Sequence, residues 1–470
     1  ISIGETWKCS SCGKEVPNGS EDRPKKKCKG CGANRSDNNS YGIVVGFGQL
    51  KDDDEDDDIA STPQILVKLL DHNTIQVACC RDSFLALTKQ GEVYSWKSDD
   101  EWNIAPVRMA GLEGAIITHI EVGTLHFIAL SSEGNIYIWG VYDHCDAGSG
   151  KTVRHIAEND DDDPNFPVQL LYEPKQKAKS ISSGSDFCAA LLDDNTMVTW
   201  GIGTEGQMAR DVPKFKEASD EAIEDMLYPK PPLWDDGMPR KVLSLACGYN
   251  HLLVVVENHE VYSSGVNNRG QLGHGDLIGR QSLTKINALK GIAQVAAGRG
   301  FSYFVDQTGR KVSACGTGHH GQLGLPVIPG MNPSSYDRKL PIRVPLIYKN
   351  SIEEDEPIVE EEQPFIKQIS CGMDHVLAIT SNGDTYSWGK GNDGKCGQGI
   401  LEGVIWRPKK LESNPFKKFL HVSAGFHSSL GVAMVDEEVL SLTKNVSKYI
   451  HKHNPRKIAE IAPILKSILE

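Results

Sequence analysis

The chain has 470 residues, with 63 acidic and 50 basic side chains, and its formal net charge is −13. Neutralising phosphates requires a basic surface, so this balance argues against a protein that coats DNA or RNA along its whole surface. No apolar stretch reaches the roughly 18 residues of a membrane-spanning helix, and we expect no membrane partner.

Residues 1–40 contain two Cys-x-x-Cys pairs, Cys9 with Cys12 and Cys28 with Cys31, separated by fifteen residues. Two such pairs supply four thiolates in the tetrahedral arrangement that Zn²⁺ prefers. A segment this short and this polar has no core of its own, so bound zinc would supply its folding free energy. The sequence predicts a four-cysteine zinc module, and four unliganded thiols in an unfolded tail are the alternative.

The remaining eight of the twelve cysteines mostly lie in apolar, strand-like runs. This pattern favours a reducing intracellular compartment, the cytoplasm or the nucleus, over a disulfide-bonded secreted protein. An organellar or cytoskeletal location stays open.

The first segment also resembles a known zinc-binding family. Trp7 before the first pair and the ending Cys31-Gly-Ala-Asn34-Arg35 are similar to zinc fingers of the Ran-binding-protein type, although the spacing between the pairs is longer here. The resemblance implies binding of single-stranded RNA, ubiquitin or Ran. Candidate residues on the finger surface are Trp7, Arg23, Lys25, Lys26, Lys27, Asn34 and Arg35. A small docking finger with a basic, solvated turn is the other interpretation.

From residue 41 onward one sequence motif recurs: a small residue, then His or an aromatic residue, an apolar strand, a polar turn and a second strand. The seven copies begin at Cys79, Gly123, Gly184, Gly248, Gly298, Gly372 and Ala424. Second strands end near Trp96, Trp139, Trp200, Ser264, Cys315 and Trp388. The spacing from the small residue to this end, measured from Cys80 in the first copy, is 16 residues in five copies and 17 in the Gly298 copy. Such constancy predicts antiparallel hairpins, and the variable segments between them predict loops of a β-propeller.

The two ends of the repeat region complement each other. The last copy lacks a Trp-Gly strand, whereas Gly42-Ile-Val-Val-Gly-Phe-Gly-Gln-Leu50 is a strand of that type with no hairpin before it. We therefore expect an all-β, seven-bladed propeller in which the N-terminal strand closes the last blade. The predicted domains are a zinc finger at 1–40, a propeller at 41–442 and a C-terminal helical tail at 443–470.

These repeats, over residues 41–441, and the stretch from Gly201 to Phe215 resemble the regulator of chromosome condensation family. The resemblance implies a seven-bladed propeller and, from the family's founding activity, guanine-nucleotide exchange on Ran. At the matching positions an acidic residue is kept as Asp186, another is replaced by Thr124, and an expected His is replaced by Phe301 or Ser302. A protruding wedge maps to residues 141–150. The candidate GTPase contacts are Asp186, Thr124, Asp143 and Asp146.

These losses favour a protein-interaction scaffold with the zinc finger as a second contact site, and exchange on Ran or a Ran-like small GTPase is the alternative. We find no hydrolytic or transfer active site and expect no small-molecule substrate. Gly148-Ser-Gly-Lys-Thr152 has Cys145 where a phosphate-binding loop needs its first glycine, which argues against nucleotide binding. His126, His251, His375 and His427 recur at equivalent positions and are predicted to be structural.

Insertions and the tail carry the remaining predictions. Acidic runs at residues 52–58, 160–163 and 353–362 are typical of solvated loops, or of loops that attract a basic partner. Residues 214–227 are predicted to form a short helix. In the tail, Asn454 as a cap, Pro455 at the first helical position and the stripe Ile458, Ile461 and Leu465 predict an amphipathic helix.

Overall fold

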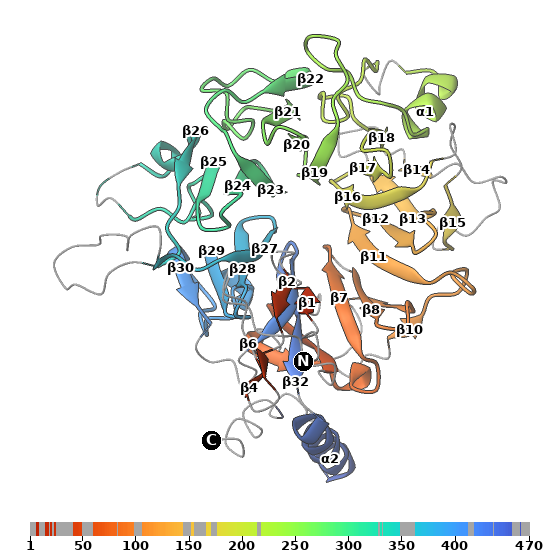
Figure 1. Ribbon diagram of the computed structural model, residues 1–470, viewed down its shortest axis with the longest axis vertical. Coiled ribbons are helices and arrows are strands. Elements are labelled where there is room, and N and C mark those ends of the chain that lie inside the picture. Colours follow the sequence, from red (N-terminus) through yellow and green to blue (C-terminus); the bar gives the residue numbers. More distant parts are fainter. Residues whose placement is uncertain are drawn as a thin grey trace.

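The computed structural model describes residues 6–8, 15–17, 19–20, 23–24, 41–48, 60–81, 83–97, 106–143, 152–154, 166–170, 176–213, 218–327, 330, 332–347, 362–411, 418–435, 437–453 and 461. Seven antiparallel sheets stand as blades around a central axis (Figure 1). The predicted all-β, seven-bladed propeller with a short C-terminal helix is confirmed.

The blades follow the chain order, and their strands run from the axis outward. Blade 1 contains β7 (Thr74–Cys79), β8 (Ser83–Thr88), β9 (Val93–Lys97) and β10 (Val107–Arg108). Blade 2 contains β11 (Ile117–Val122), β12 (His126–Ser131), β13 (Ile136–Asp143) and β15 (Val168–Gln169), and β14 (Thr152–Arg154) pairs with the end of β13. Blade 3 contains β16 (Ala178–Ser183), β17 (Phe187–Leu192) and β18 (Met197–Gly201).

The next three blades repeat the four-stranded plan. Blade 4 contains β19 (Val242–Cys247), β20 (His251–Val256), β21 (Val261–Gly265) and β22 (Arg280–Lys285). Blade 5 contains β23 (Ile292–Ala297), β24 (Phe301–Asp306), β25 (Val312–Gly316) and β26 (Arg338–Arg343). Blade 6 contains β27 (Ile366–Cys371), β28 (His375–Thr380), β29 (Thr385–Lys390) and β30 (Val404–Lys410).

Blade 7 combines strands from both ends of the repeat region. It contains β31 (Phe419–Ala424), β32 (Ser428–Val435), β5 (Tyr41–Gly48) and β6 (Ala60–Ile65). Strand β5 pairs with β32 along its whole length, from Ser428 opposite Gly48 to Val435 opposite Tyr41. The predicted closure by the N-terminal strand is therefore confirmed, because β5 and β6 complete the last blade and cover the edge of β32.

The apolar core consists of seven separate layers, one between each pair of neighbouring blades. Each layer is filled by side chains that alternate along the second and third strands, because successive strand residues point to opposite faces. The layer between blades 7 and 1 brings Val44 and Leu430 against Phe84 and Trp96. An open ring of seven blades would have six such layers, so the seventh layer is what closure adds to the core.

Blade 3 lacks a fourth strand among the described residues, and its outer edge is covered differently. The helix α1 (Asp220–Leu227), capped by the Ser219 side chain, lies in the insertion predicted to be helical. Buried Arg210 donates hydrogen bonds to the carbonyl oxygens of Thr199, Asp225, Met226 and Tyr228. One guanidinium thus joins the edge of β18 to the orphan carbonyls at the end of α1.

We predict that Arg210→Met lowers the free energy of unfolding by about 3 kcal/mol, because several buried carbonyl oxygens lose their donor. Chemical denaturation of the variant and the wild type measures this loss. Arg108→Met is the matched control, since Arg108 is exposed and its ion pair with Glu92 lies at the surface, where such pairs contribute at most about 1 kcal/mol. Equal losses in the two variants would contradict the role given to Arg210.

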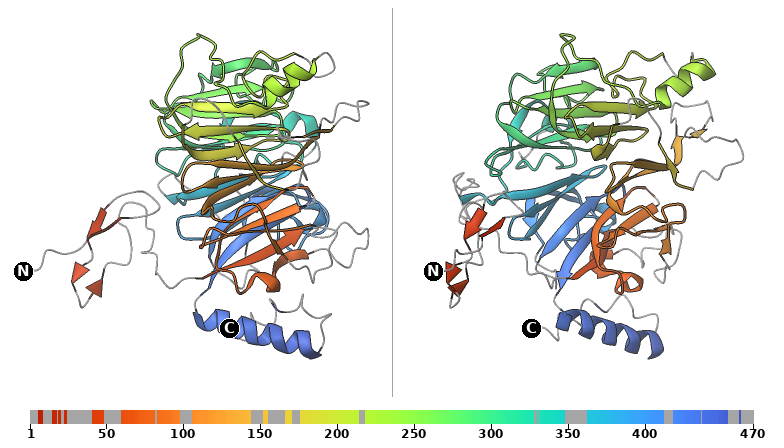
Figure 2. Two further views of the ribbon diagram at one scale, coloured as in Figure 1. Left: turned by 90° about the vertical axis from the view of Figure 1, so that its right-hand side faces the viewer. Right: turned by 45° about the vertical axis from the view of Figure 1, so that its right-hand side comes forward.

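The C-terminal helix α2 (Glu437–His453) lies outside the ring, against blade 7 (Figure 2). Leu440 and Ile450 join the core layer of blade 7, and the Lys444 ammonium lies 2.8 Å from an oxygen of Asp71. Helix α2 begins at Glu437, inside the segment assigned by sequence to the propeller, which was expected to extend to residue 442. No further strand is needed there, because β5 already pairs with β32. The helix predicted after Asn454 lies outside the described residues except for Ile461.

Four short strands are described near the N terminus. They are β1 (Thr6–Lys8), β2 (Glu15–Pro17), β3 (Gly19–Ser20) and β4 (Arg23–Pro24), which pair as β1 with β2 and β3 with β4. Side chains in this region are outside the described part of the chain, so the predicted zinc module stays a prediction.

Candidate functional site

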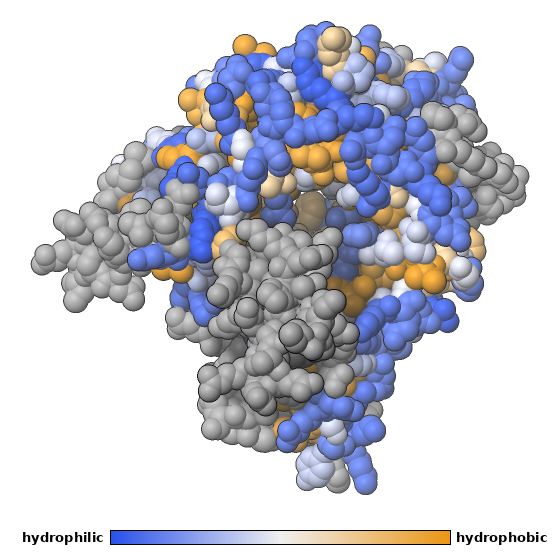
Figure 3. Space-filling model, in the orientation of Figure 1, coloured by the Kyte–Doolittle hydropathy of each residue, from blue (hydrophilic) through white to orange (hydrophobic). Residues whose placement is uncertain are grey.

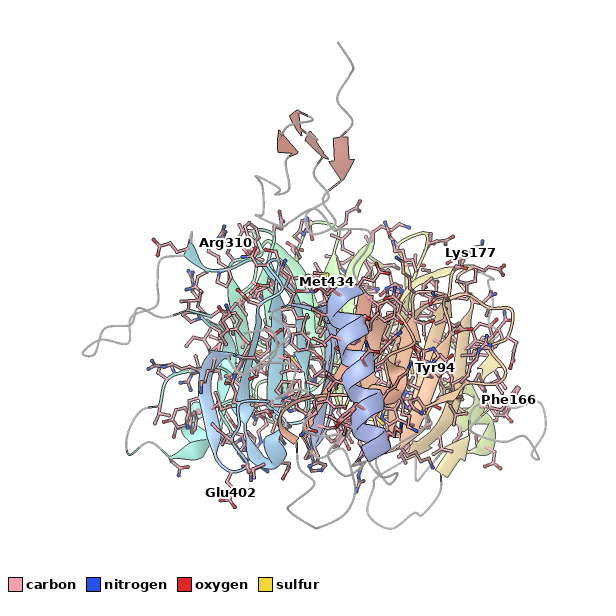
Figure 4. The ribbon with its side chains drawn as sticks, turned by 90° about the horizontal axis from the view of Figure 1, so that it is seen from below. Tyr94, Phe166, Lys177, Arg310, Glu402 and Met434 are labelled. Carbon is pink, nitrogen blue, oxygen red and sulfur yellow. The ribbon has the colours of Figure 1, made fainter. Side chains whose placement is uncertain are left out.

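The connections between strands distribute over two faces of the ring. The turns between first and second strands, centred on Cys80, Gly123, Gly184, Gly248, Gly298, Gly372 and Gly425, lie on one face, which we call the glycine face. Loops between third and fourth strands share this face, whereas the hairpins between second and third strands lie on the opposite one, the hairpin face. Figure 4 shows Glu402, from a glycine-face loop, opposite Arg310 and Lys177.

The glycine-face turns are tight and are bonded to one another. In each, the backbone N–H of the central residue donates to the carbonyl three residues later, as Gly123 does to His126 at 2.8 Å. The N–H groups of Thr124, Ser185 and Tyr249 donate to carbonyls of the following blade at 3.0–3.2 Å. Two further bonds, from the Arg299 N–H to Gly372 and from the Met373 N–H to Gly425, extend this series, which holds the turns of blades 2 to 7 in fixed mutual positions.

A histidine lies behind the glycine in three blades. A Cβ atom on Gly123 or Gly248 would overlap the imidazole of His126 or His251, so these turns require glycine. His251 Nε2 lies 2.8 Å from Ser302 Oγ and His375 Nε2 lies 2.7 Å from Ser429 Oγ, both in the next blade. These fully buried imidazoles therefore connect neighbouring blades, as the predicted structural role requires.

The protonation of these imidazoles follows from the hydroxyl partners. Ser302 Oγ donates to the carbonyl of Gln271 and Ser429 Oγ donates to that of Lys395, so each hydroxyl accepts from histidine. The donor is then Nε2–H, and within the described part of the chain Nδ1 of His251 and of His375 has no hydrogen-bond partner. Burial lowers the pKa of His251 to about 4 and that of His375 to about 3.

The predicted equivalence of His427 to these histidines is wrong. The register places Ser428, opposite Gly48, at the position that His375 holds opposite Gly389. His427 is one residue earlier and is exposed, with its Nδ1 3.4 Å from an Asp393 oxygen. The repeat in blade 7 begins at Gly425 rather than Ala424, which shifts the alignment by one residue.

Four side chains gather at the axis of the glycine face. Each comes directly after the central glycine of its turn in the sequence of blades 4 to 7. The four residues line a shallow pocket of about 100 Å³ and are Tyr249, Arg299, Met373 and Phe426. The rings of Tyr249 and Phe426 have centroids 6.3 Å apart, and the Arg299 guanidinium lies 5.3 Å from the Tyr249 ring centroid. We call these four residues the axial cluster. Arg299 is exposed and the other three are half-buried.

The sequence singled out other residues of this face. Thr124 and Asp186 occupy the turns of neighbouring blades, joined by the hydrogen bond from the Thr124 N–H to the Ser185 carbonyl at 3.0 Å. Thr124 is 5% exposed, which leaves little of it for a partner, whereas half-buried Asp186 accepts a hydrogen bond from Ser185 Oγ. The Asp143 backbone ends β13, and its side chain and Asp146 lie outside the described residues.

An additional carboxylate of this face was not predicted. Asp374 holds in blade 6 the position that Asp186 holds in blade 3, and it lies 3.5 Å from Nδ1 of His320. Burial alone would raise the pKa of Asp374, but the nearby His320 imidazole and the charge of Lys395 lower this pKa to about 2. Lys395 is 1% exposed and stands after Gly394, where three other repeats have a glutamine after the corresponding glycine, namely Gln207, Gln271 and Gln322. A cation is therefore buried beneath this turn.

The sequence analysis did not predict the axial cluster either, although two of its members lie in the repeat motifs Gly248-Tyr249 and Gly298-Arg299. A signal exists: the residue after each repeat glycine varies while its neighbours stay similar. Only ring closure shows that these variable residues meet at one point.

First strands line a channel of about 320 Å³ below the axial cluster. Figure 3 shows the hairpin face, where the ring is hollowed at its centre. The lining is largely polar, and Gln76 and Gln368 bond both backbone groups of a residue in the next blade. Glu121 also lines this channel, and burial raises its pKa to about 7.

The raised pKa of Glu121 predicts a pH-dependent stability term. From about pH 4.5 to pH 7 the folded protein holds a proton that the unfolded chain has lost, so stability falls as pH rises through this range. Glu121→Gln should leave stability unchanged near the lower limit and raise it by up to about 3 kcal/mol near pH 8. Thermal melting of both proteins near pH 4.5 and near pH 8 tests this prediction. The same stability difference between the two proteins at both pH values would contradict it.

Metal-binding side chains do not cluster in the described ranges, where no group of three or more His, Cys, Asp or Glu residues could hold a metal ion. Cys9, Cys12, Cys28 and Cys31 lie outside those ranges, as do Gly148 and Lys151 of the phosphate-loop-like motif. No helix in the described part of the chain is long and apolar enough to cross a membrane.

Comparison with known proteins adds to this geometry. The family described as RCC1-like domain matches residues 38–431. The Ultraviolet-B receptor UVR8 of Arabidopsis thaliana is 28% identical over 364 residues, which cover 75% of this chain and 72% of the receptor. The human regulator of chromosome condensation is 23% identical over 364 residues, covering 73% of this chain and 78% of that protein.

The fold also matches solved structures. The structure of Prp20p from Saccharomyces cerevisiae, described together with its binding properties to Gsp1p and histones, covers 87% of this chain and 95% of its own with a TM-score of 0.67. The sequence identity is 19%, so this likeness establishes the shared fold.

Proposed function

Because the chain belongs to the family of RCC1-like domains, we propose that it is a protein-interaction scaffold whose glycine face binds a protein partner. The axial cluster is the observation that carries this proposal. Aromatic residues, Met and Arg are enriched at the centres of protein interfaces, and all four residues of the cluster are of these types. A rigid ring with variable loops offers a broad surface around that centre.

The rigidity of the site supports binding without large rearrangement. The backbone hydrogen bonds between neighbouring turns and the buried His–Ser contacts fix the positions from which the axial cluster projects. A partner therefore meets side chains that are already close together, which reduces the entropy lost on binding.

Alanine variants test the proposal. A double variant, Tyr249→Ala with Phe426→Ala, is expected to weaken retention of the proteins captured by the wild type by about 30-fold or more. The control is Tyr449→Ala, which removes a 68% exposed tyrosine of α2. If the double variant and the control capture the same proteins as the wild type, the glycine face is not the binding surface.

Guanine-nucleotide exchange on Ran or a Ran-like small GTPase is the alternative function. It is supported by Asp186, which keeps the acidic position of the family, and by the relative named regulator of chromosome condensation. Purified protein at substoichiometric amounts should then accelerate release of a fluorescent GDP analogue from Ran, and Asp186→Ala should slow this release. An unchanged release rate with folded protein would leave the scaffold function alone.

We also propose that Cys9, Cys12, Cys28 and Cys31 bind one Zn²⁺ in a module that serves as a second contact site. Four thiolates in two Cys-x-x-Cys pairs match the ligand set of structural zinc. RNA, ubiquitin or another protein fits this module, given Trp7 and the lysines at 25–27. A thiol-reactive reagent should release about one zinc per chain, and freshly purified protein without zinc would contradict this assignment.

A reducing intracellular compartment is the proposed location. None of the seven described cysteines outside the N-terminal segment forms a disulfide, and six of them are buried. Burial raises the thiol pKa of Cys79, Cys315 and Cys371, which keeps them as unreactive thiols rather than disulfide partners.

A further inference from the structure

Arg299 differs from the other stacked cations of the described residues. Arg240 stacks on Tyr262 and pairs with Asp236, and Lys444 lies over Tyr41 and pairs with Asp71. Arg310 stacks on Phe365 and donates to the carbonyl of Gln363. The Arg299 guanidinium has its stacking contact with Tyr249 and, within the described part of the chain, neither an ion pair nor a hydrogen bond.

The carboxylates around Arg299 are engaged elsewhere. On the neighbouring turns and loops, Asp374 faces His320 at 3.5 Å and Asp393 faces His427 at 3.4 Å. Asp337 lies 3.4 Å from Arg269 and accepts the Gly318 N–H. These three carboxylates thus each have a partner, whereas Arg299 has no ion-pair partner among the described residues.

The position of Arg299 is fixed by its surroundings. Its backbone N–H points to the Gly372 carbonyl at 3.4 Å, and the Tyr249 N–H donates to the Gly298 carbonyl at 3.1 Å. Guanidinium and ring are therefore presented by two turns bonded to each other. A stacked guanidinium keeps its planar fork of N–H donors free for bidentate recognition of a carboxylate.

We propose that Arg299 binds an Asp or Glu side chain of the protein partner, with Tyr249, Met373 and Phe426 packing against an apolar residue next to that acid. The proposal rests on the glycine face being the binding surface. The argument for an acidic group is charge complementarity. An unpaired cation at the centre of an aromatic patch selects an anionic group flanked by apolar surface.

A random twelve-residue peptide library displayed on phage provides the probe. It is selected on the immobilised full chain and, in parallel, on Arg299→Glu and Arg240→Glu variants. Arg240 is the matched control because it also stacks on a tyrosine but already has a carboxylate partner. Enriched peptides are then synthesised, and their affinities for each variant and for the Tyr249→Ala, Phe426→Ala double variant are measured.

We expect peptides selected on the wild type to share an Asp or Glu beside an aromatic or large aliphatic residue. Arg299→Glu should weaken their binding by about 30-fold or more, Arg240→Glu should leave it unchanged, and exchanging the peptide acid for Arg should restore binding to Arg299→Glu. Peptides that need Tyr249 and Phe426 but carry no acid would overturn the inference and leave the proposed function standing. If no selected peptide depends on the axial cluster, both are overturned.

Discussion

Acidification from about pH 7 to pH 5 is expected to destabilise the propeller through its buried histidines. Burial lowers the pKa to about 4 for His251 and to about 3 for His375 and His421. Below about pH 6.5 the unfolded chain binds protons at these positions that the folded protein does not bind, so stability falls as pH falls. Each histidine contributes about 2 kcal/mol to this loss at pH 5.

Glu121 opposes the histidines over the same range, because its protonation favours the folded protein. The net loss from these four groups in the wild type is therefore about 4 kcal/mol, and the full loss of about 6 kcal/mol from the three histidines appears in the Glu121→Gln variant. Thermal melting at the two pH values, with and without this substitution, measures both quantities.

His251→Phe isolates one histidine. Blades 3 and 5 already hold phenylalanine, Phe187 and Phe301, at the position of His251, so the ring should fit behind Gly248. We expect a cost of about 1 kcal/mol at pH 7, from the lost hydrogen bond to Ser302, and an acid-induced loss smaller by about 2 kcal/mol. His427→Phe is the control, because His427 is exposed. An acid response unchanged by His251→Phe would contradict the account.

Gly42→Ala is expected to destabilise the ring where it closes. Gly42 stands in β5, its N–H donates to Asn73 Oδ1, and an added Cβ atom would overlap the Thr74 carbonyl oxygen. Because Thr74 belongs to the first strand of blade 1, the overlap can be relieved only by moving blade 7 away from blade 1. We expect a loss of about 3 kcal/mol, at the upper end of the range for overpacking.

Hydrogen exchange locates this effect. Amides of β5 and β7 should exchange faster in Gly42→Ala, and the global unfolding midpoint should fall. Gly391→Ala serves as control, since Gly391 has a negative φ and the nearest atom to an added Cβ would be 3.3 Å away. A midpoint for Gly42→Ala equal to that of the control would contradict the closure between β5 and blade 1.

The repeat hairpins were predictable because two chemical constraints mark them. A glycine is needed where an imidazole or phenyl ring packs behind the turn, and the glycine of the Trp-Gly pair adopts positive φ, as Gly201 does at 115°. The first and fourth strands were not recognised, because channel-lining positions tolerate Gln, Ser, Ala and Glu, and the outer strands begin after loops of variable length.

Helix α2 and the axial cluster show why the end of the propeller and the centre of the candidate site could not be predicted from the sequence. The repeat template extends past Val435 in sequence, and only the pairing of β32 with β5 shows that the strand ends there. Tyr249 and Phe426 are separated by 177 positions along the chain, and their contact depends on the closed arrangement of the seven blades. Such a contact follows from closure rather than from any local pattern.

Site-specific photo-crosslinking tests the proposed protein-binding role of the glycine face most directly. A photoreactive phenylalanine analogue replaces Tyr249 in one protein and Ile116, which is 61% exposed beside the hairpin turn at Gly91, in another. Our account predicts discrete crosslinked protein adducts from position 249 and none from position 116. Adducts from position 116 alone, or equal adducts from both, would contradict it.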